Sequence, residues 1–167
     1  RFINTGGTLT RGIEIDANVG GDLAGGRWNV HLNGSYLDTF KTKSFDIDTY
    51  TDNLVGEYER YFNLPLEWKH TLSFAWNKGD FAHVLTQVYR DGYKDWKPGG
   101  IVNGDIPANW DPNVDEYVIY NYSLAWTGIE NFRVVAGVRN LFNTDPPFTV
   151  RYLDDGDGAG WEARVAD

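Results

Sequence analysis

Several features that mark other classes of protein are missing from this chain of 167 residues. It contains no cysteine, which excludes a disulfide framework and the common thiolate metal sites. It contains no methionine and no apolar stretch after a basic start, so we expect it to be part of a longer protein. Its net charge is −9 and its pI about 4.7. A nucleic-acid-binding protein needs a basic surface against phosphates, so the charge argues against nucleic acid as a partner.

Long hydrophobic runs are also missing, and their absence excludes only one kind of membrane protein. No apolar run approaches the ~20 residues that a membrane-spanning helix requires. A membrane-spanning β-strand needs only ~9–11 residues with every second one apolar, so the mean hydropathy of −0.47 does not argue against it. Aromatic residues, in contrast, make up 16% of the chain, an excess that needs a structural explanation.

The sequence does contain strict alternation of apolar and polar residues, which is typical of β-strands. The alternation predicts six strands, over residues 8–19, 27–38, 66–77, 81–91, 118–127 and 132–139. The last two flank a short Gly/Asn turn and predict an antiparallel hairpin. The two faces of residues 81–91 stay unranked, because Leu85 and Tyr89 compete with Val84 and Val88 for the apolar side.

The connections between these strands alternate in length. Short connections are expected at residues 20–26, 78–80 and 128–131, and long ones at 39–65, at 92–113 and from 143 onward. An outer-membrane barrel has this arrangement, with short turns at one end and long loops at the other. No linker divides the chain. We therefore predict one all-β unit over residues 1–167, an antiparallel up-and-down meander of about six strands that forms a segment of a large transmembrane β-barrel.

The aromatic residues support this interpretation by their positions. Five are expected near the short-turn end of their strands, namely Trp28, Trp76, Phe81, Trp126 and Phe132. Amphipathic rings gather at membrane–water interfaces, so these residues predict a membrane-interface girdle. A second girdle is expected at the other end, from Tyr36, Trp68, Tyr89 and Tyr120. The alternative is that aromatic rings simply suit strands and protein cores.

Residues that could carry chemistry are dispersed. The three histidines, His31, His70 and His83, lie on different strands without ligand spacing, and no nucleophile–base motif is present, so we expect neither an enzyme nor a cofactor. A weak calcium candidate consists of Asp154, Asp155 and Asp157, although a solvated acidic loop is favoured. Arg11 interrupts an apolar side and either meets anionic lipid phosphate or indicates a register error of one residue.

The long loops contain aromatic residues that can contact a ligand. Such rings stack on sugars or on the flat face of a chelate. The candidate ligand-binding residues are Tyr50, Tyr58, Tyr61, Tyr93, Trp96 and Trp110. The alternative is that these rings pack the loops against one another.

Three stretches resemble a known family. The segment GVRNLFNTDPPF is similar to the motif that ends the second-to-last strand of TonB-dependent outer-membrane receptors, and the matching residues are Gly137, Val138, Asn140, Leu141, Phe142, Asn143, Pro146 and Pro147. Residues 4–19 resemble an upstream strand of the family on Asn4, Gly6, Gly12, Ile13 and Glu14. Residues 160–167 resemble the approach to the final strand of the family.

This resemblance implies a fold and a function. The intact protein would be a barrel of about 22 strands, closed by a plug domain of the same chain, in the outer membrane of a Gram-negative bacterium. It would import a scarce, bulky nutrient, namely an iron–siderophore, cobalamin or an oligosaccharide, with energy from the TonB complex. The present chain would be the C-terminal part of the barrel, which contacts outer-membrane lipid and supplies wall and extracellular loops. The plug, the TonB-contacting segment and the final strand would lie outside it.

Two other functions stay open from the residues themselves. One is a soluble all-β carbohydrate-binding module with loop tryptophans. The other is a passive porin-like channel without a plug. Studied alone, a six-strand segment of a barrel has open edges and an uncovered apolar face, so we expect it to self-associate.

Overall fold

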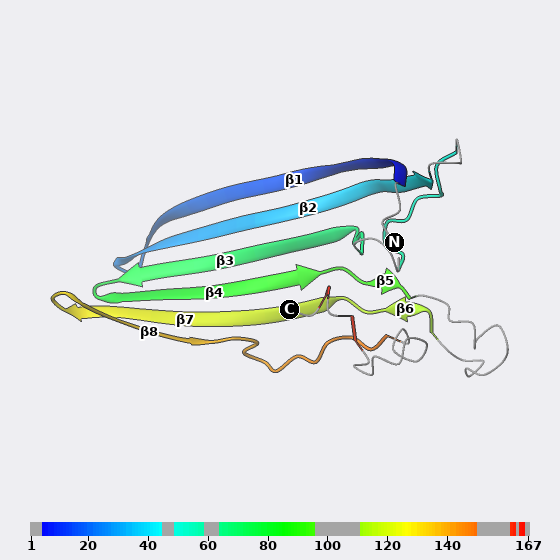
Figure 1. Cartoon of the computed structure of the whole chain (residues 1–167). Coiled ribbons are helices and arrows are strands. Elements are labelled where there is room, and N and C mark those ends of the chain that lie inside the picture. The colour runs from blue at the N-terminus through cyan, green and yellow to red at the C-terminus, as the bar shows by residue number, and fades with distance from the viewer. Residues whose placement is uncertain are drawn as a thin grey trace.

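The structure, a computed structural model, describes residues 5–44, 49–58, 64–95, 111–149, 161–162 and 164–165. These residues form a curved antiparallel sheet with the strand order β1-β2-β3-β4-β7-β8 (Figure 1). Its strands are β1 (Thr5–Leu23), β2 (Gly26–Ser44), β3 (Trp68–Lys78), β4 (Phe81–Arg90), β7 (Tyr117–Ile129) and β8 (Phe132–Val138). A second, two-stranded sheet pairs β5 (Tyr93–Lys94) with β6 (Asn113–Val114). The predicted antiparallel meander of six strands is therefore confirmed.

The six-stranded sheet is open, with β1 and β8 as its two edges. No helix occurs in the described ranges, in agreement with the all-β prediction. Accordingly, none of these ranges holds a helix that is long and apolar enough to cross a membrane. Closure into a barrel is not observed, and the larger barrel stays a prediction.

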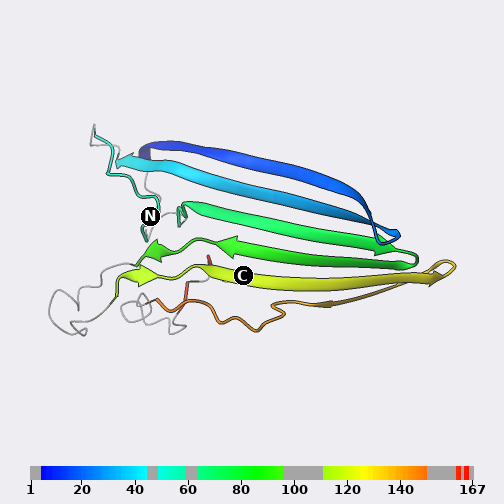
Figure 2. The same cartoon turned by 180° about the vertical axis from the view of Figure 1, so that it is seen from behind.

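The tight turns lie at one end of the sheet and the long connections at the other (Figures 1 and 2). The β1–β2 turn consists of Ala24 and Gly25, whose φ angles are 53° and 76°. A two-residue turn with positive φ at both positions matches the twist of a hairpin. Gly79 and Asn131 supply positive φ in the other two tight turns. This end of the sheet is called the short-turn end, and the other is called the long-loop end.

The first two strands are longer than predicted, at 19 residues each. Residues 20–23 belong to β1 and 39–44 to β2, although both ranges were predicted to be connections. A β-bulge explains the second error, because Arg11 pairs with Thr39 while Gly12 pairs with Leu37, leaving Asp38 as the extra residue. The extra residue shifts the alternation of apolar and polar residues by one position. The alternating pattern therefore stops at Asp38 in the sequence, although β2 stays paired with β1 as far as Ser44. Likewise, Ile129 extends β7 beyond its predicted end.

The register assigns the side chains to two faces, because directly opposed residues of an antiparallel pair share a face. The apolar face comprises Ile13, Ile15, Ala17, Val19 and Gly21 of β1; Trp28, Val30, Leu32, Gly34 and Tyr36 of β2; Trp68, His70, Leu72, Phe74 and Trp76 of β3; Phe81, His83, Leu85, Gln87 and Tyr89 of β4; Val118, Tyr120, Tyr122, Leu124 and Trp126 of β7; and Phe132, Val134, Ala136 and Val138 of β8. The polar face carries the residues between them, among them Glu14, Asp16, Asn29, His31, Lys69, Asn121 and Arg133.

This register also decides the faces of β4, which the sequence left unranked. Leu85 and Tyr89 lie on the apolar face, opposite Phe74 and His70 of β3. Val84 and Val88 therefore lie on the polar face. The polar face is thus hydrophilic on β1 and β2 and partly apolar on β4.

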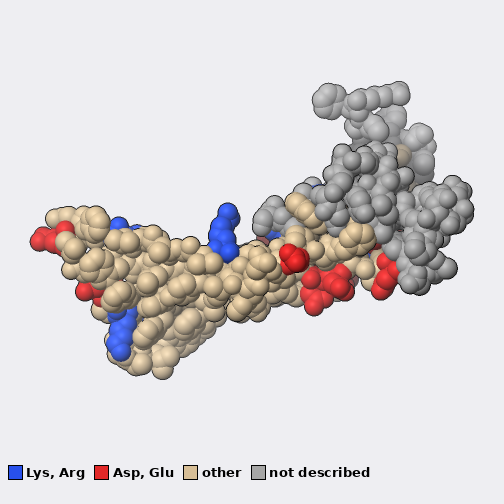
Figure 3. Space-filling model, turned by 90° about the horizontal axis from the view of Figure 1, so that it is seen from below, with Lys and Arg blue, Asp and Glu red and all other residues tan. Residues whose placement is uncertain are grey.

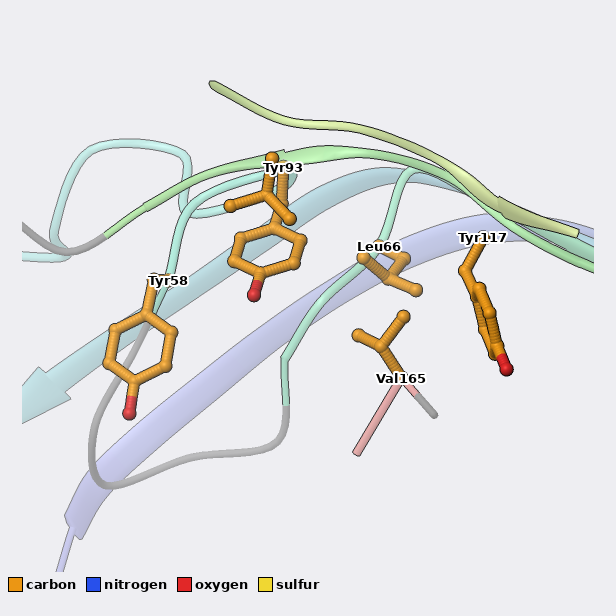
Figure 4. Packing of buried hydrophobic residues seen from close by; sticks show 6 residues of the cluster. Tyr58, Leu66, Tyr93, Tyr117 and Val165 are labelled. Carbon is orange, nitrogen blue, oxygen red and sulfur yellow. The ribbon is translucent and has the colours of Figure 1, made fainter. Parts of the chain in front are cut away.

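A small hydrophobic core lies at the long-loop end rather than between two layers of sheet (Figure 4). This loop-end core consists of Tyr58, Leu66, Tyr93, Val114, Tyr117 and Val165. Its segments are joined by backbone bonds, since Tyr58 N–H donates to the Lys94 carbonyl at 2.8 Å. The Arg90 Nε–H donates to the Val165 carbonyl at 2.9 Å and ties the C-terminal residues to β4. The strands themselves have no second layer among the described residues.

Candidate functional site

The apolar face exposes large hydrophobic side chains on the edge strands β1 and β8. Ile13, Val19 and Val138 are 61%, 59% and 50% exposed. Monomeric soluble proteins seldom expose a contiguous apolar surface of more than a few hundred Å², and larger ones mark protein or membrane contacts. A sheet face that spans six strands is therefore a candidate interaction surface.

Charge is excluded from the centre of this face. From Ile13 to Gly21 on β1 and at the corresponding positions of the other five strands, no apolar-face residue is Asp, Glu, Lys or Arg. Seen from the side of β8, uncharged side chains cover most of the strands and the carboxylates lie toward the two ends (Figure 3). The polar face differs, since Asp16 there accepts hydrogen bonds from Asn33 at 3.1 Å and contacts His31 Nε2 at 3.0 Å.

Two rows of aromatic residues border the uncharged field. The short-turn band is Trp28, Trp76, Phe81, Trp126 and Phe132. Within it Trp28 lies opposite Trp76 and Phe81 lies opposite Trp126. The long-loop band is Tyr36, Trp68, Tyr89 and Tyr120, in which Tyr36 lies opposite Trp68.

The separation of the two bands is nearly constant from strand to strand. The two band residues are eight positions apart in β2 (Trp28 and Tyr36), and the same holds in β3 and β4. In β7 they are six positions apart. In both bands, the residues on β4 and β7 are displaced toward the short-turn end relative to those on β2 and β3. Two parallel, oblique rows are the pattern that tilted strands produce when they cross a slab of fixed thickness.

The few polar groups between the bands bond to one another. Trp68 Nε1–H donates to Nδ1 of His70 at 2.8 Å. Because an indole can only donate, Nδ1 is the acceptor and the neutral imidazole carries its proton on Nε2. His70 Nε2–H therefore donates to Gln87 Oε1, with 3.0 Å between nitrogen and oxygen. Gln87 Nε2–H in turn donates to the Tyr120 hydroxyl at 2.6 Å. The result is a one-directional chain of hydrogen bonds across β3, β4 and β7.

A second pair behaves in the same way. His83 Nδ1 lies 2.7 Å from the Tyr122 hydroxyl. His70 additionally stacks on Tyr89, with ring centroids 5.0 Å apart. Both ring nitrogens of His70, both polar atoms of Gln87 and Nδ1 of His83 thus have hydrogen-bond partners within the face. Sequence analysis placed the two histidines on strands but missed these partners, which depend on the register.

The family-motif segment forms a compact turn after β8. Asn140 has a φ of 48°, a conformation that asparagine tolerates better than most residues. Its Nδ2–H donates to the Thr144 carbonyl and its Oδ1 accepts from Thr144 N–H, both at 2.9 Å. Asn140 N–H donates to Asn121 Oδ1 at 2.9 Å, and Leu141 N–H donates to the Tyr120 carbonyl. The turn is thereby fastened to β7.

The remaining motif residues have different environments. Gly137 lies in β8, whereas Pro146 and Pro147 are half-buried in the segment after the turn. Leu141 is exposed, and so is Phe142, whose ring meets Tyr120 edge-on at a centroid distance of 5.3 Å. Phe142 thus continues the long-loop band toward β8.

The predicted ligand-binding aromatics separate into three groups. Tyr50 is exposed, with the Lys43 ammonium 5.5 Å from its ring centroid. Tyr58 and Tyr93 are buried in the loop-end core, so their rings pack against other loops as in the alternative interpretation, and they are not available to a ligand here. Burial, and next the charge of Asp95, raises the pKa of Tyr93. Tyr61, Trp96 and Trp110 lie outside the described residues.

The last candidate from the sequence is the weak calcium site. Asp154, Asp155 and Asp157 lie outside the described residues. Within the described ranges no three His, Cys, Asp or Glu side chains gather as a metal site. Comparison of the chain with protein-family models, curated proteins and solved structures found no match.

Proposed function

We propose that this chain is part of the wall of an outer-membrane β-barrel, with the apolar face in lipid and the polar face toward the barrel interior. The observation that carries the proposal is the exposed, charge-free field between two parallel aromatic bands. In water, each exposed large side chain of this field, at 38–61% exposure, forfeits part of the ~1.5–3 kcal/mol that full burial contributes. In lipid that penalty disappears, while polar groups need partners of their own. The hydrogen bonds that link Trp68, His70, Gln87 and Tyr120, and the one between His83 and Tyr122, supply such partners.

The separation of the bands supports the same conclusion. Eight residues of antiparallel strand span about 27 Å. With the tilt of ~35–45° that is usual in such barrels, this length gives about 19–22 Å along the membrane normal, close to the ~25 Å height of their apolar band. Contact with a second soluble layer would not require two bands at a fixed distance.

We further propose that the barrel is a TonB-dependent receptor that imports an iron–siderophore, cobalamin or an oligosaccharide. Support for this part comes from the resemblance of the segment around Asn140, Leu141 and Phe142. Those residues form a turn that fastens the end of β8 to β7 and adds a ring to the long-loop band. In such a receptor the chain would supply wall and extracellular loops, while the plug and the TonB-contacting segment would lie elsewhere in the protein.

The proposal that the apolar face lies in lipid can be tested with labels at pairs of neighbouring positions. The chain has no cysteine, so single cysteines can carry a fluorescent label. Leu72→Cys and Leu85→Cys place the label on the apolar face, and Thr71→Cys and Thr86→Cys place it on the polar face. In phosphatidylcholine vesicles, quenchers on the lipid chains should affect the first pair and aqueous iodide the second. Equal access of iodide to all four positions, or a chain that stays in the aqueous phase, would refute the proposal.

The alternatives predict other results. A soluble carbohydrate-binding module would remain a water-soluble monomer and would lose sugar affinity in Trp96→Ala or Trp110→Ala. A passive channel would insert into vesicles like the receptor. A complete reading frame without a plug-sized segment upstream would favour that channel over the receptor.

A further inference from the structure

The β1–β2 ladder continues beyond the long-loop band and carries cations on the apolar face. The last pair of β2 with β3 is Tyr36 with Trp68, whereas β1 and β2 remain paired as far as Thr5 and Ser44. Along this extension Arg11 lies opposite Thr39, Leu9 opposite Lys41 and Gly7 opposite Lys43. The three cations therefore follow the aromatic band in successive tiers. The register also resolves the question that Arg11 raised in the sequence, since it shares a face with Ile13.

These cations are available to an external anion. The nearest carboxylate oxygen of Asp38 is 4.0 Å from Arg11, and both side chains are more than half exposed. Exposed pairs of this kind contribute at most ~1 kcal/mol and exchange readily. No ion pair of Lys41 or Lys43 occurs with another described residue, although the Lys43 ammonium also lies 5.5 Å from the centroid of the exposed Tyr50 ring. The cluster stands out because the chain as a whole carries a net charge of −9.

The depth of the cluster indicates the kind of anion. Residues 39 to 43 of one strand span about 13 Å along the strand, and with the same tilt of ~35–45° about 9–11 Å along the membrane normal. The polar zone of a bilayer is only ~5–7 Å thick on each side, so the single phosphate of an ordinary phospholipid would meet the first tier, that of Arg11. Lys41 and Lys43 lie one and two tiers farther out. A headgroup with more than one phosphate would reach the outer tiers as well.

We propose that Arg11, Lys41 and Lys43 form a binding site for an anionic lipid whose headgroup carries more than one phosphate. The acyl chains lie on Ile13, Ile15 and their neighbours, and the phosphates contact the three cations. The inference rests on the proposed function, because it requires the apolar face to be in lipid. It adds the chemical class of the lipid that binds at one place on that face.

The test compares lipid enrichment around the protein in three kinds of vesicle. One contains phosphatidylcholine alone, the second adds lipid A with two phosphates, and the third adds monophosphoryl lipid A at twice the amount, so that total phosphate is equal. EDTA is present, so that divalent cations cannot bridge carboxylates to phosphates. The protein is extracted in mild detergent, and the ratio of lipid A to phosphatidylcholine that accompanies it is measured by mass spectrometry.

The wild-type chain should enrich the bisphosphorylated lipid over the monophosphorylated one. The variant R11Q/K41Q/K43Q should lower that enrichment about fivefold for each cation removed, or roughly a hundredfold in all. The matched variant R27Q/K69Q/R133Q removes the same charge elsewhere and should stay within about twofold of wild type, since these cations face away from the lipid.

Each result has a distinct meaning. Three results would overturn the lipid site: equal enrichment of the two lipids, no effect of the first variant, or equal effects of both variants. If the wild type still inserts into phosphatidylcholine, the proposed function stands in each of these cases. Failure of the wild type to insert into phosphatidylcholine would instead overturn the proposed function, and the lipid site with it. A soluble inositol polyphosphate at millimolar concentration should not reduce the enrichment; if it did, the site would recognise free phosphates rather than a lipid.

Discussion

Replacement of Asn140 should release the turn that follows β8. Its side chain makes two hydrogen bonds with the backbone of Thr144, and its φ of 48° is unfavourable for most other residues. Asn143 offers a matched control, since its φ is 52° and its side chain makes no hydrogen bond with the described residues. The two positions therefore share the backbone requirement and differ in the side-chain bonds.

The expected magnitudes follow from this difference. Asn140→Gly keeps the conformational freedom and loses two hydrogen bonds, which at ~1 kcal/mol each costs about 2 kcal/mol. Asn140→Ala adds about 1 kcal/mol, because alanine is strained at positive φ. Asn143→Ala should cost only that ~1 kcal/mol, and Asn143→Gly should be close to neutral.

Hydrogen exchange of the backbone amides in this segment measures these differences. The reporters are the amides of Leu141, bonded to the Tyr120 carbonyl, and of Asn143, bonded to the Asn140 carbonyl. A loss of 2 kcal/mol in the free energy of local opening corresponds to about thirtyfold faster exchange of Leu141 in Asn140→Gly. The interpretation of the motif as a hydrogen-bonded fastening would be wrong if Asn140→Gly and Asn143→Gly exchanged alike, or if the alanine variants ranked in the opposite order.

Two further predictions concern the apolar face and the loop-end core. In lipid, Tyr122→Phe should lower the free energy of unfolding by ~1–3 kcal/mol, because His83 loses its partner. The double variant His83→Phe/Tyr122→Phe should recover most of this loss in urea unfolding, and additive losses would contradict the prediction. The raised pKa of Tyr93 means that the unfolded state releases this proton first, near pH 10, so stability is retained below that pH and falls as the pH rises further. Tyr93→Phe should remove this alkaline component of the urea midpoint, and an unchanged pH profile would exclude Tyr93 as its cause.

The sequence predicted the number, order and direction of the six strands of the main sheet, because each of them crosses one sheet with unlike sides. It missed the short strands β5 and β6, at the two ends of the predicted connection 92–113. Because the two faces of the sheet differ in polarity, apolar and polar residues alternate along each strand. Tight turns with Gly or Asn mark the ends of the strands. The same reasoning located the aromatic residues at the ends of their strands. It failed at Asp38, where a bulge shifted the alternation while backbone pairing continued.

The remaining errors arose where distant parts of the chain decide the outcome. The faces of β4 were ambiguous because His83 and Gln87 lie among apolar neighbours, and only pairing with β3 and β7 assigns them partners. The burial of Tyr58 and Tyr93 depends on Val165, far along the chain. No local pattern distinguishes a loop aromatic that meets such a partner from one, like Tyr50, that stays exposed.

The meander has a consequence for how such a wall changes in evolution. Every ladder of the main sheet joins strands that follow one another along the chain once the small β5–β6 pair is set aside. Deleting the β3–β4 hairpin would bring β2 next to β7 in the same antiparallel sense and leave the other tight turns untouched. Circumference can therefore grow or shrink by whole hairpins, without new crossings and without redesign of the strands that remain.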